Sequence, residues 1–316
     1  MASEITKLIF LFFLWYSLIC LASSVPDDYF ILNQDLDKFN SEKEVLQLFK
    51  VWKQKSEREH QNLQEETRRF QTFQNNLKHI RQRNAERKLS SDYSLGLNKF
   101  SDVSYEEFSK IYLHETSEPI IESNMVGKMV SNNESCPNAP SSLDWRLSGA
   151  EGSTMAHFNM SLKMVVLPQK ETPYSANNSG CNSTLEQKKF ATIDGYNYCW
   201  QTPISENSLF CSVAKQPISV SFYANQDFMS YKSGIFVGAN CSSIGSSTHN
   251  HAVLIVGYGS LGAGQDYWIV KNSWGASWGQ RGYIFIKRNT DSTQGVCDIN
   301  YAGAYPTKQT NTTFKG

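Results

Sequence analysis

The stretch "HAVLIVGYGSLGAGQDYWIVKNSWGASWGQRGYIFIKR", from His251 to Arg288, contains three runs rich in aromatic and β-branched residues. Short glycine-bearing segments separate the runs, which is the pattern of strands joined by turns. A further run that alternates apolar and polar residues, "PISVSF", lies ahead of them at 217–222. Strands in such close succession predict an antiparallel sheet that curls or closes into a barrel.

The N-terminal part of the chain, from residue 25 to about 110, is charged and has helical spacing instead. Val45, Leu46, Phe49 and Trp52 fall on one helix face and predict an amphipathic helix. A longer helix is predicted to begin near Leu63. Six of its residues recur at steps of three or four and form one stripe: Glu65, Arg69, Phe73, Asn76, Ile80 and Asn84. The order of Glu65 and Arg69 favours an ion pair on the helix surface. Periodicity alone predicts no more than a helix packed on its neighbour.

A segment with a spacing of two residues follows these helices. Gly96, Asn98, Phe100 and Asp102 alternate, which predicts a short extended segment, and "YEEF" after them predicts the start of another helix. Residues 115–140 lack periodicity and are polar, with prolines. They are predicted to form an exposed linker that proteases cut easily.

Composition and the first residues limit the class of protein. The 316 residues include 30 basic and 30 acidic side chains, so no charge excess indicates a nucleic-acid partner. After a short segment with one lysine, "LIFLFFLWYSLICLA" and "ASS" have the layout of a secretory signal peptide. The apolar run is shorter than the roughly 20 residues of a membrane span. We therefore expect a soluble protein once the signal is removed.

Secretion makes the cysteines disulfide candidates. Six remain after Cys20 leaves with the signal: Cys136, Cys181, Cys199, Cys211, Cys241 and Cys297. Their pairing cannot be read from the sequence, because six cysteines allow 15 pairings, and no spacing resembles a zinc site. Asn-x-Ser/Thr sequons, at which we expect glycans, begin at Asn133, Asn159, Asn177, Asn182, Asn240 and Asn311.

The motifs together resemble a papain-family cysteine protease precursor, most like the plant members that are similar to cathepsin L. The six-residue helix stripe matches the family's ERFNIN motif, and the alternating segment matches its G-x-N-x-F-x-D motif. "SSLDWR" at 141–146 resembles the start of the mature enzyme. "NHAVLIVGYG" resembles the strand that carries the catalytic histidine, and the "KNSWG" segment resembles the one that carries the catalytic asparagine.

The resemblance implies an α+β fold with four parts: a signal peptide at 1–24, an inhibitory pro-domain of the I29 type at 25–110, a linker at 111–140 and a papain-like peptidase domain at 141–316. In the family the mature domain has a helical half and an antiparallel β-barrel half, and the pro-segment lies in the cleft between them. Peptide or protein substrates and the chain's own pro-segment are the expected partners of a monomer that needs no cofactor or metal. An extracellular or vacuolar (lysosomal) location is expected, with no membrane or nucleic-acid contact.

The resemblance also assigns roles at the active site. His251 corresponds to the general base, Asn272 to the residue that orients its ring, and Trp274 to the indole that shields their hydrogen bond. A thiol attacks as the thiolate, and a neighbouring imidazolium stabilises that form. His249 has no role in the family and is expected to be a solvated turn residue. The alternative, a two-histidine metal site, lacks a third ligand nearby in sequence.

The nucleophile of this mechanism is missing. The family places a glutamine that helps form the oxyanion hole and then C-G-[SA]-C-[WY] after "DWR". No cysteine occurs between Trp145 and Gly180, and only 27 residues separate Arg146 from Tyr174. By comparison with the family motif, roughly fifty residues are absent. We expect that the chain as written is inactive, through exon skipping, gene decay or a faulty gene model.

No other residue is a convincing substitute for that cysteine. Ser153 lacks the expected neighbours, Cys136 precedes the mature domain, and Cys181 matches a structural half-cystine whose partner falls in the missing part. The resemblance pairs Cys241 with Cys297. It gives no partner to Cys199 and Cys211, for which pairing with each other is open.

Two consequences of the missing segment remain as hypotheses. Losing the central helix of the helical half exposes apolar surface, and the mature domain is then at risk of not folding as a compact unit. The intact pro-domain suggests an alternative function, a secreted inhibitor or binding protein for cysteine proteases.

Overall fold

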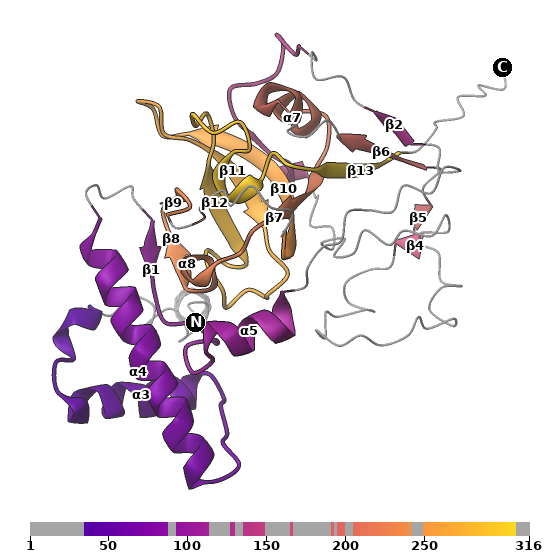
Figure 1. Ribbon diagram of the computed structural model, residues 1–316. Helices are drawn as coiled ribbons and strands as arrows, with labels where there is room; N and C mark the ends of the chain where they lie inside the picture. The colour runs from indigo at the N-terminus through magenta and orange to yellow at the C-terminus, as the bar shows by residue number, and fades with distance from the viewer. Residues whose placement is uncertain are drawn as a thin grey trace, which may run out of the picture. The chain divides into compact units, whose positions relative to one another are not determined.

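The computed structural model describes residues 35–87, 93–113, 127–129, 135–148, 165–166, 191–192, 195–199, 205–239, 241 and 249–307 (Figure 1). The predicted signal peptide, the six sequon asparagines, Cys181, Ser153 and most of the stretch 149–204 lie outside these residues. The chain divides into two compact units, Met1–Gln74 and Asn75–Gly316. No described helix is long and apolar enough to cross a membrane.

The first unit is built from helices. It contains the 3-10 turn η1 (Leu36–Lys38), helix α3 (Glu42–Lys55) and the first half of α4 (Leu63–Ala85). The side chain of Ser41 accepts a hydrogen bond from the backbone N–H of Glu44, whose carboxylate accepts one from the N–H of Ser41. This capping box satisfies backbone groups that a helix start leaves unpaired, and it fixes where α3 begins.

Aromatic packing forms the core of this unit. Val45, Phe49 and Trp52 are buried as predicted, but Leu46 is 38% exposed and Leu48 takes its place in the core. Phe73 of α4 is fully buried, with its ring centroid 5.2 Å from Phe49 and 5.3 Å from Trp52. Burying aromatic side chains of this size contributes most of the stability of so small a unit.

The second unit is built on one main sheet. Its described strands follow the spatial order β2-β6-β13-β7-β10-β11-β12-β9, with β3 paired to β10. Their bounds are β2 (Gly127–Met129), β3 (Leu143–Asp144), β6 (Gly195–Cys199), β7 (Ile218–Phe222), β9 (Ile235–Phe236), β10 (His251–Ser260), β11 (Asp266–Lys271), β12 (Tyr283–Lys287) and β13 (Gly303–Thr307). The four strands predicted from the sequence are β7, β10, β11 and β12, and all their pairings with one another are antiparallel. The α+β fold class is confirmed.

Shorter elements complete this unit. Two further pairs of strands are β1 (Ser94–Leu95) with β8 (Tyr231–Ser233) and β4 (Val165–Val166) with β5 (Ala191–Thr192). The helices are α5 (Tyr105–Tyr112), α7 (Glu206–Val213) and α8 (Gln226–Met229), and the 3-10 turns are η2 (Trp145–Ser148) and η3 (Val296–Asp298). We call residues 205–307 the barrel half, because they include the core strands β7, β10, β11 and β12.

Strand β3 joins the start of the expected mature domain to the barrel half. Gly257 and Tyr258 of β10 lie opposite Asp144 and Leu143. A Cβ atom at Gly257 would lie 2.2 Å from the carbonyl oxygen of Leu143, so only glycine allows this approach. The indole Nε1–H of Trp145 also donates to the carbonyl of Val213 at 2.8 Å. The "SSLDWR" segment is therefore held by the barrel half at several points.

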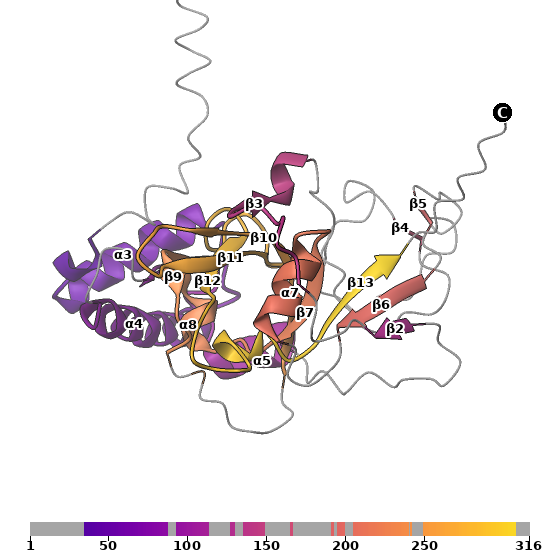
Figure 2. The ribbon, with the colours of Figure 1, turned by 90° about the horizontal axis from the view of Figure 1, so that it is seen from above.

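Part of the stretch predicted to be an exposed linker forms a strand. Residues 127–129 form β2, which pairs in parallel with β6 and extends the main sheet at one edge (Figure 2). The sequence "GKM" is too short to show alternation, so its conformation depends on pairing with a distant strand.

The alternating segment at 96–102 is not a continuous extended run. Strand β1 ends at Leu95, and turns follow in which Ser101 and Val103 donate backbone N–H bonds to the carbonyls of Asn98 and Phe100. The motif residues at 96–102 are therefore spaced by two in a buried, folded loop. They do not form a strand with one buried and one exposed face.

The disulfides differ in part from the expectation. Cys241 is bonded to Cys297, the pair that the resemblance implies. Cys211 is bonded to Cys136 with a Cα–Cα distance of 5.5 Å, which excludes the pairing of Cys199 with Cys211 that the sequence left open. Sequence spacing could not give this result, since the two cysteines are 75 residues apart and meet only through the fold.

Candidate functional site

His251 and Asn272 meet at the ends of two inner strands of the main sheet. Strand β10 begins at His251 and the antiparallel strand β11 ends at Lys271, so the two residues lie at neighbouring strand ends. The Nε2 atom of His251 is 2.9 Å from Oδ1 of Asn272. Both side chains are buried, with 8% and 3% of their surfaces exposed. The structure thus brings together two residues that are 21 positions apart in the sequence.

The hydrogen bonds around Asn272 determine the protonation of the imidazole ring. The backbone N–H of Ser273 donates to Oδ1 of Asn272 at 2.8 Å, which identifies that atom as the amide oxygen. An amide oxygen only accepts, so Nε2 of His251 carries a proton. In the neutral ring the lone pair is then on Nδ1, the nitrogen that can take a proton from a nucleophile. A ring held in this tautomer can act as a general base.

Trp274 packs against this pair. Its ring is stacked on that of His251, with centroids 4.8 Å apart and planes 26° apart, and it is 1% exposed. An indole face stabilises a cation placed over it, so the stacking favours the imidazolium that forms when His251 takes a proton. The loop after β11 turns back through Gly279, whose backbone φ of 57° is costly for residues with a Cβ.

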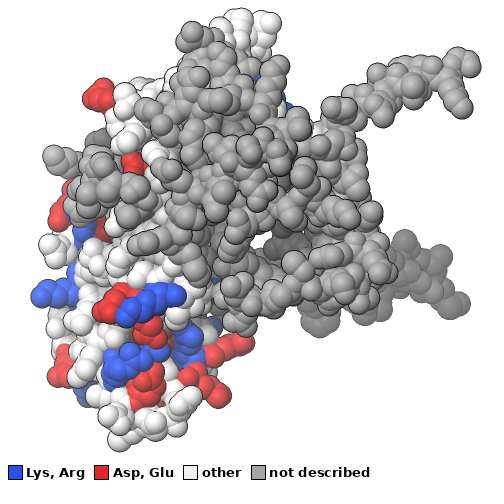
Figure 3. All heavy atoms as spheres, turned by 45° about the vertical axis from the view of Figure 1, so that its right-hand side comes forward, with Lys and Arg blue, Asp and Glu red and all other residues white. Residues whose placement is uncertain are grey.

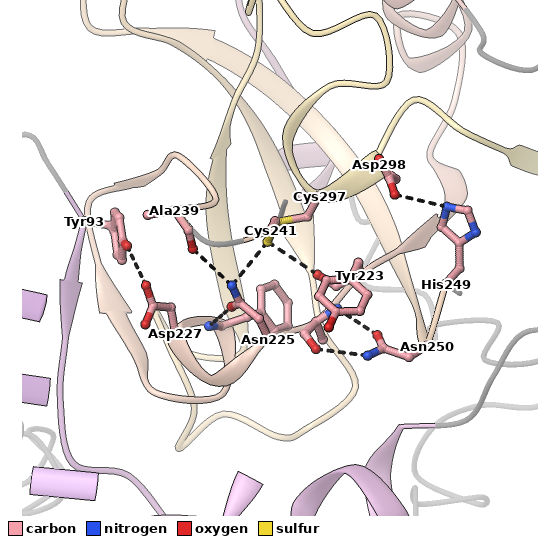
Figure 4. Close-up of a disulfide and its surroundings, with 12 residues drawn as sticks. Tyr93, Tyr223, Asn225, Asp227, Ala239, Cys241, His249, Asn250, Cys297 and Asp298 are labelled. Atoms are coloured by element: carbon pink, nitrogen blue, oxygen red, sulfur yellow. Dashed lines mark hydrogen bonds and ion pairs between the residues drawn. A yellow bond between two sulfur atoms is a disulfide. The ribbon is translucent and has the colours of Figure 1, made fainter. Parts of the chain in front are cut away.

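His249 is not the solvated turn residue that we expected. It is 5% exposed, and its ring lies 4.1 Å from that of Tyr301, with Nε2 3.8 Å from a carboxylate oxygen of Asp298 (Figure 4). Burial lowers the pKa of His249 and raises that of Asp298. The sequence "THNH" gave no sign of this burial, because Tyr301 and Asp298 come from the far end of the chain.

Polar side chains hold the segment before β10. Asn250 accepts a hydrogen bond from the N–H of Ala224 at 2.8 Å and donates one to its carbonyl at 3.1 Å. The Cys241–Cys297 disulfide lies near the same loop, and the amide of Asn225 donates to Sγ of Cys241 (Figure 4). The two bonds to Ala224 hold Asn250, the residue directly before the strand end that carries His251.

Helix α5 covers the site. Phe108 is fully buried with its ring 4.8 Å from that of Trp274, and Phe100 lies 5.8 Å from the same indole. The hydroxyl of Tyr105 donates to the carbonyl of Ala224 at 2.7 Å, beside Asn250. Burial raises the pKa of Tyr105 to about 12. Residues 100–108 therefore pack against the indole that stacks on His251.

The asparagines of the two N-terminal motifs bind backbone groups. Asn76 donates to the carbonyls of Ser101 and Val103, and Asn84 exchanges two hydrogen bonds with the backbone of Leu95. The amide of Asn98 donates to the carbonyl of Met229 in the barrel half. Of the remaining motif residues, Ile80 and Asp102 are buried, Gly96 donates its N–H to Ser230, and Glu65 bonds Arg69 at 2.7 Å.

Asp227 is a site residue that the sequence analysis missed. Its carboxylate, only 2% exposed, accepts hydrogen bonds from His79 at 2.7 Å, Arg83 at 2.9 Å and Tyr93 at 2.7 Å. Burial alone would raise the pKa of Asp227, but these hydrogen bonds and the charge of Arg83 outweigh it and hold the pKa below the usual value. The helical spacing of His79 and Arg83 was the available signal, because residues four apart share a helix face.

Two disulfides occupy four cysteines of the described residues. Cys136, Cys211, Cys241 and Cys297 form disulfides, so none of them carries a thiolate. Among the described residues, no group of three His, Cys, Asp or Glu side chains is arranged to hold a metal ion. Figure 3 shows acidic and basic side chains intermingled on the face in view, with no large patch of one sign among its coloured residues.

Comparisons with known proteins agree on one family. The model of the papain family cysteine proteases matches residues 130–307, and that of the cathepsin propeptide inhibitor domain (I29) matches residues 49–108. The P34 probable thiol protease of Glycine max is 36% identical over 96% of this chain and 95% of its own length. Papaya proteinase 4 of Carica papaya is 31% identical over 89% of this chain and 92% of its own length. A solved structure of a recombinant stem bromelain precursor aligns with a TM-score of 0.67 and 29% identity, over 84% of this chain and 99% of its own.

Proposed function

The chain belongs to the papain family of cysteine proteases and carries that family's propeptide inhibitor domain, and from this premise we propose that it is a zymogen-like member without catalytic activity. The observation that carries the proposal is the absence of any cysteine between Trp145 and Gly180, where the family's nucleophile is expected. His251 and Asn272, to which we assign the roles of general base and orienting residue, are in contact.

The lengths of the alignments support a missing segment. The alignment with the soybean relative spans 366 positions, and 96% of 316 residues is about 303, so roughly 60 positions have no residue of this chain. The oxyanion glutamine and the nucleophilic cysteine are expected in that segment. Of the seven cysteines in the sequence, four are in disulfides and Cys20 precedes Val25, which leaves Cys181 and Cys199.

The chemistry that remains is insufficient for peptide-bond hydrolysis by the family's mechanism. That mechanism requires a thiolate to attack the carbonyl carbon and form an acyl-enzyme, with His251 returning a proton to the leaving amine. A base without a nucleophile cannot form the intermediate. Removing the nucleophile from a comparable catalytic triad lowers kcat by about 10⁶-fold.

The direct test is an activity and labelling assay on the full chain after acidification. We expect no cleavage of a dipeptide-coumarin substrate and no labelling by an epoxide thiol inhibitor, read by intact mass. Papaya proteinase 4 prepared alongside is the positive control. Turnover together with labelling of any cysteine in this chain overturns the proposal.

A chimera separates the missing segment from the rest of the site. Residues 147–173 are replaced by the corresponding segment of papaya proteinase 4, which lies within the range where the chain is short. Because His251 and Asn272 are already in contact, we expect the chimera to gain turnover and epoxide labelling. The same chimera with His251→Ala is the matched control and should lose turnover. A folded chimera that labels but does not turn over contradicts the assignment of His251.

Inhibition of other cysteine proteases is a second candidate function, favoured by the propeptide inhibitor match at residues 49–108. The segment that would act on another protease is held on the chain's own barrel half through Asp227 and Trp274. We therefore assign inhibition to a released fragment. A fragment of residues 25–130 should inhibit papaya proteinase 4 at micromolar concentration, and failure to do so ends this candidate.

We also propose that the chain enters the secretory pathway. The apolar segment near the N-terminus has the layout of a signal peptide, and two disulfides fit an oxidising compartment. N-terminal sequencing of the secreted protein from plant cells should begin near Val25, and glycosidase treatment should reduce its mass. A product that retains Met1 contradicts the route.

A further inference from the structure

The Cys136–Cys211 disulfide joins two parts of the chain that proteolysis would separate. Cys136 precedes strand β3, whereas Cys211 is fully buried in helix α7 of the barrel half. Everything N-terminal to Cys136, including helices α4 and α5, is therefore connected to the barrel half twice. One connection is the backbone, and the other is the disulfide.

An exposed stretch follows Cys136 directly. Pro137, Asn138, Pro140, Ser141 and Ser142 are all exposed. The stretch begins with a turn in which the N–H of Ala139 donates to the carbonyl of Cys136, and it ends where Leu143 pairs with Tyr258. Both ends are anchored on the barrel half, one covalently and one by strand pairing. Exposed loops with small and polar residues are preferred sites of proteolytic cleavage.

We propose that a cut in this stretch gives a disulfide-linked two-chain protein that keeps its pro-segment. An endopeptidase adds one water across a peptide bond between Pro137 and Ser142 and leaves a new carboxylate and a new amine. The Cys136–Cys211 bond is neither oxidised nor reduced in this step. A cut N-terminal to Cys136, in contrast, leaves the pro-segment without a covalent attachment.

The Cys136–Cys211 disulfide keeps the pro-segment close to the barrel half after a cut between Pro137 and Ser142. The pro-segment contacts the barrel half through Asp227 and Trp274, and after this cut these contacts stay intramolecular. A short link gives an effective concentration in the millimolar range, so contacts that would dissociate in dilute solution re-form. His251 therefore stays covered by its neighbours after cleavage. This inference does not depend on whether the chain is catalytic.

Two insertions on either side of Cys136 test the proposal in the full chain, secreted so that disulfides form. The first variant carries a recognition sequence for tobacco etch virus protease between Pro140 and Ser141. The matched control carries the same sequence between Ser117 and Glu118. Both are cut to completion and run on denaturing gels with and without reductant.

We expect the first variant to run as one full-length species without reductant and as two fragments with it. The control should give two fragments under both conditions. Two fragments from the first variant without reductant overturn the proposal, as does a failure of the protease to cut that insertion. The double variant Cys136→Ser/Cys211→Ser with the first insertion should give two fragments without reductant. If this double variant does not fold, the comparison of the first variant with and without reductant still tests the proposal.

Discussion

Two clusters hold the pro-segment on the barrel half, and they use opposite kinds of chemistry. The polar cluster consists of Asp227 with His79, Arg83 and Tyr93 around it. The aromatic cluster consists of Trp274 with Phe100, Phe108, Phe228 and Trp278 around it. The polar cluster places one carboxylate of the barrel half among three pro-segment side chains, and the aromatic cluster packs two pro-segment rings against three rings of the barrel half.

The difference between the clusters is their response to solution conditions. A buried carboxylate among donors is stable only while it is ionised, and charge interactions weaken with added salt. Packed aromatic rings contain no group that titrates and lose little when the pH changes. The aromatic cluster is therefore expected to hold the contact at all pH values, and the polar cluster to make its strength depend on pH.

The largest effect is expected from the aromatic cluster. Phe108→Ala removes a fully buried ring that contacts Phe100, Tyr112 and Trp274, and it should lower the free energy of unfolding by about 3–5 kcal/mol. Urea denaturation followed by circular dichroism measures the change. Ile111→Ala on the same helix is the control, because Ile111 is 46% exposed and should cost far less. Equal losses from the two variants would show that the ring contacts do not matter.

A smaller effect is expected from the polar cluster. Asp227→Asn keeps the shape but removes the charge, and its amide N–H₂ faces donors, so the free energy of unfolding should fall by about 1.5–3 kcal/mol. Glu86→Gln is the control, since Glu86 also pairs with Arg83 but is 52% exposed and should change the value by no more than about 0.5 kcal/mol. A loss larger than that of Phe108→Ala would reverse the ranking of the clusters.

Asp227→Asn should also change how the free energy of unfolding depends on pH. The pKa of Asp227 lies below its ordinary value of 3.8 in the folded chain. Its stabilising contribution is therefore complete above that value and is lost as the pH falls through the folded pKa. The gap in unfolding free energy between the wild type and Asp227→Asn should narrow as the pH falls below 3.8. Urea titrations across that range measure it, and a gap that stays constant contradicts the assignment.

The smallest effect is expected from the hydrogen bond that the hydroxyl of Tyr105 donates to the carbonyl of Ala224, close to the strand that carries His251. Tyr105→Phe removes the bond to the carbonyl of Ala224 and should lower the free energy of unfolding by about 0.5–1.5 kcal/mol. Tyr112→Phe is the control, because no described residue accepts a hydrogen bond from its hydroxyl and the ring contacts are retained. Hydrogen exchange at Asn250 gives a local measurement, and unchanged exchange in Tyr105→Phe would contradict the role of this bond.

The parts of the fold that sequence predicted are those with strong local periodicity. The start of α4 at Leu63, the burial of Phe73 and Ile80, and strands β7, β10, β11 and β12 follow from the spacing of apolar residues alone. The contact between His251 and Asn272 followed from a resemblance between motifs and not from periodicity. It required knowing that the two strand ends are neighbours.

The parts that sequence did not predict depend on distant partners. His249 is buried by Tyr301, Cys211 is bonded across 75 residues, and Asp227 collects donors from two segments that are far away in the sequence. Polar residues next to turns are usually exposed, so local reasoning assigns them to the solvent. Only the tertiary arrangement provides the partners that make their burial favourable.

Strand β3 also bears on how the chain tolerates a shortened loop. Its pairing with β10, together with the bond from Trp145 to Val213, ties residues 143–145 to β10 and to the last residue of α7. The entropy of closing a flexible loop changes slowly with length, by only about 0.6 kcal/mol for each doubling. Shortening the connection between Ser148 and β4 therefore changes the closure free energy of the chain by little. In terms of chain entropy, a deletion in that connection costs little, whereas further on β4 and β5 pair with each other and β6 pairs with the main sheet.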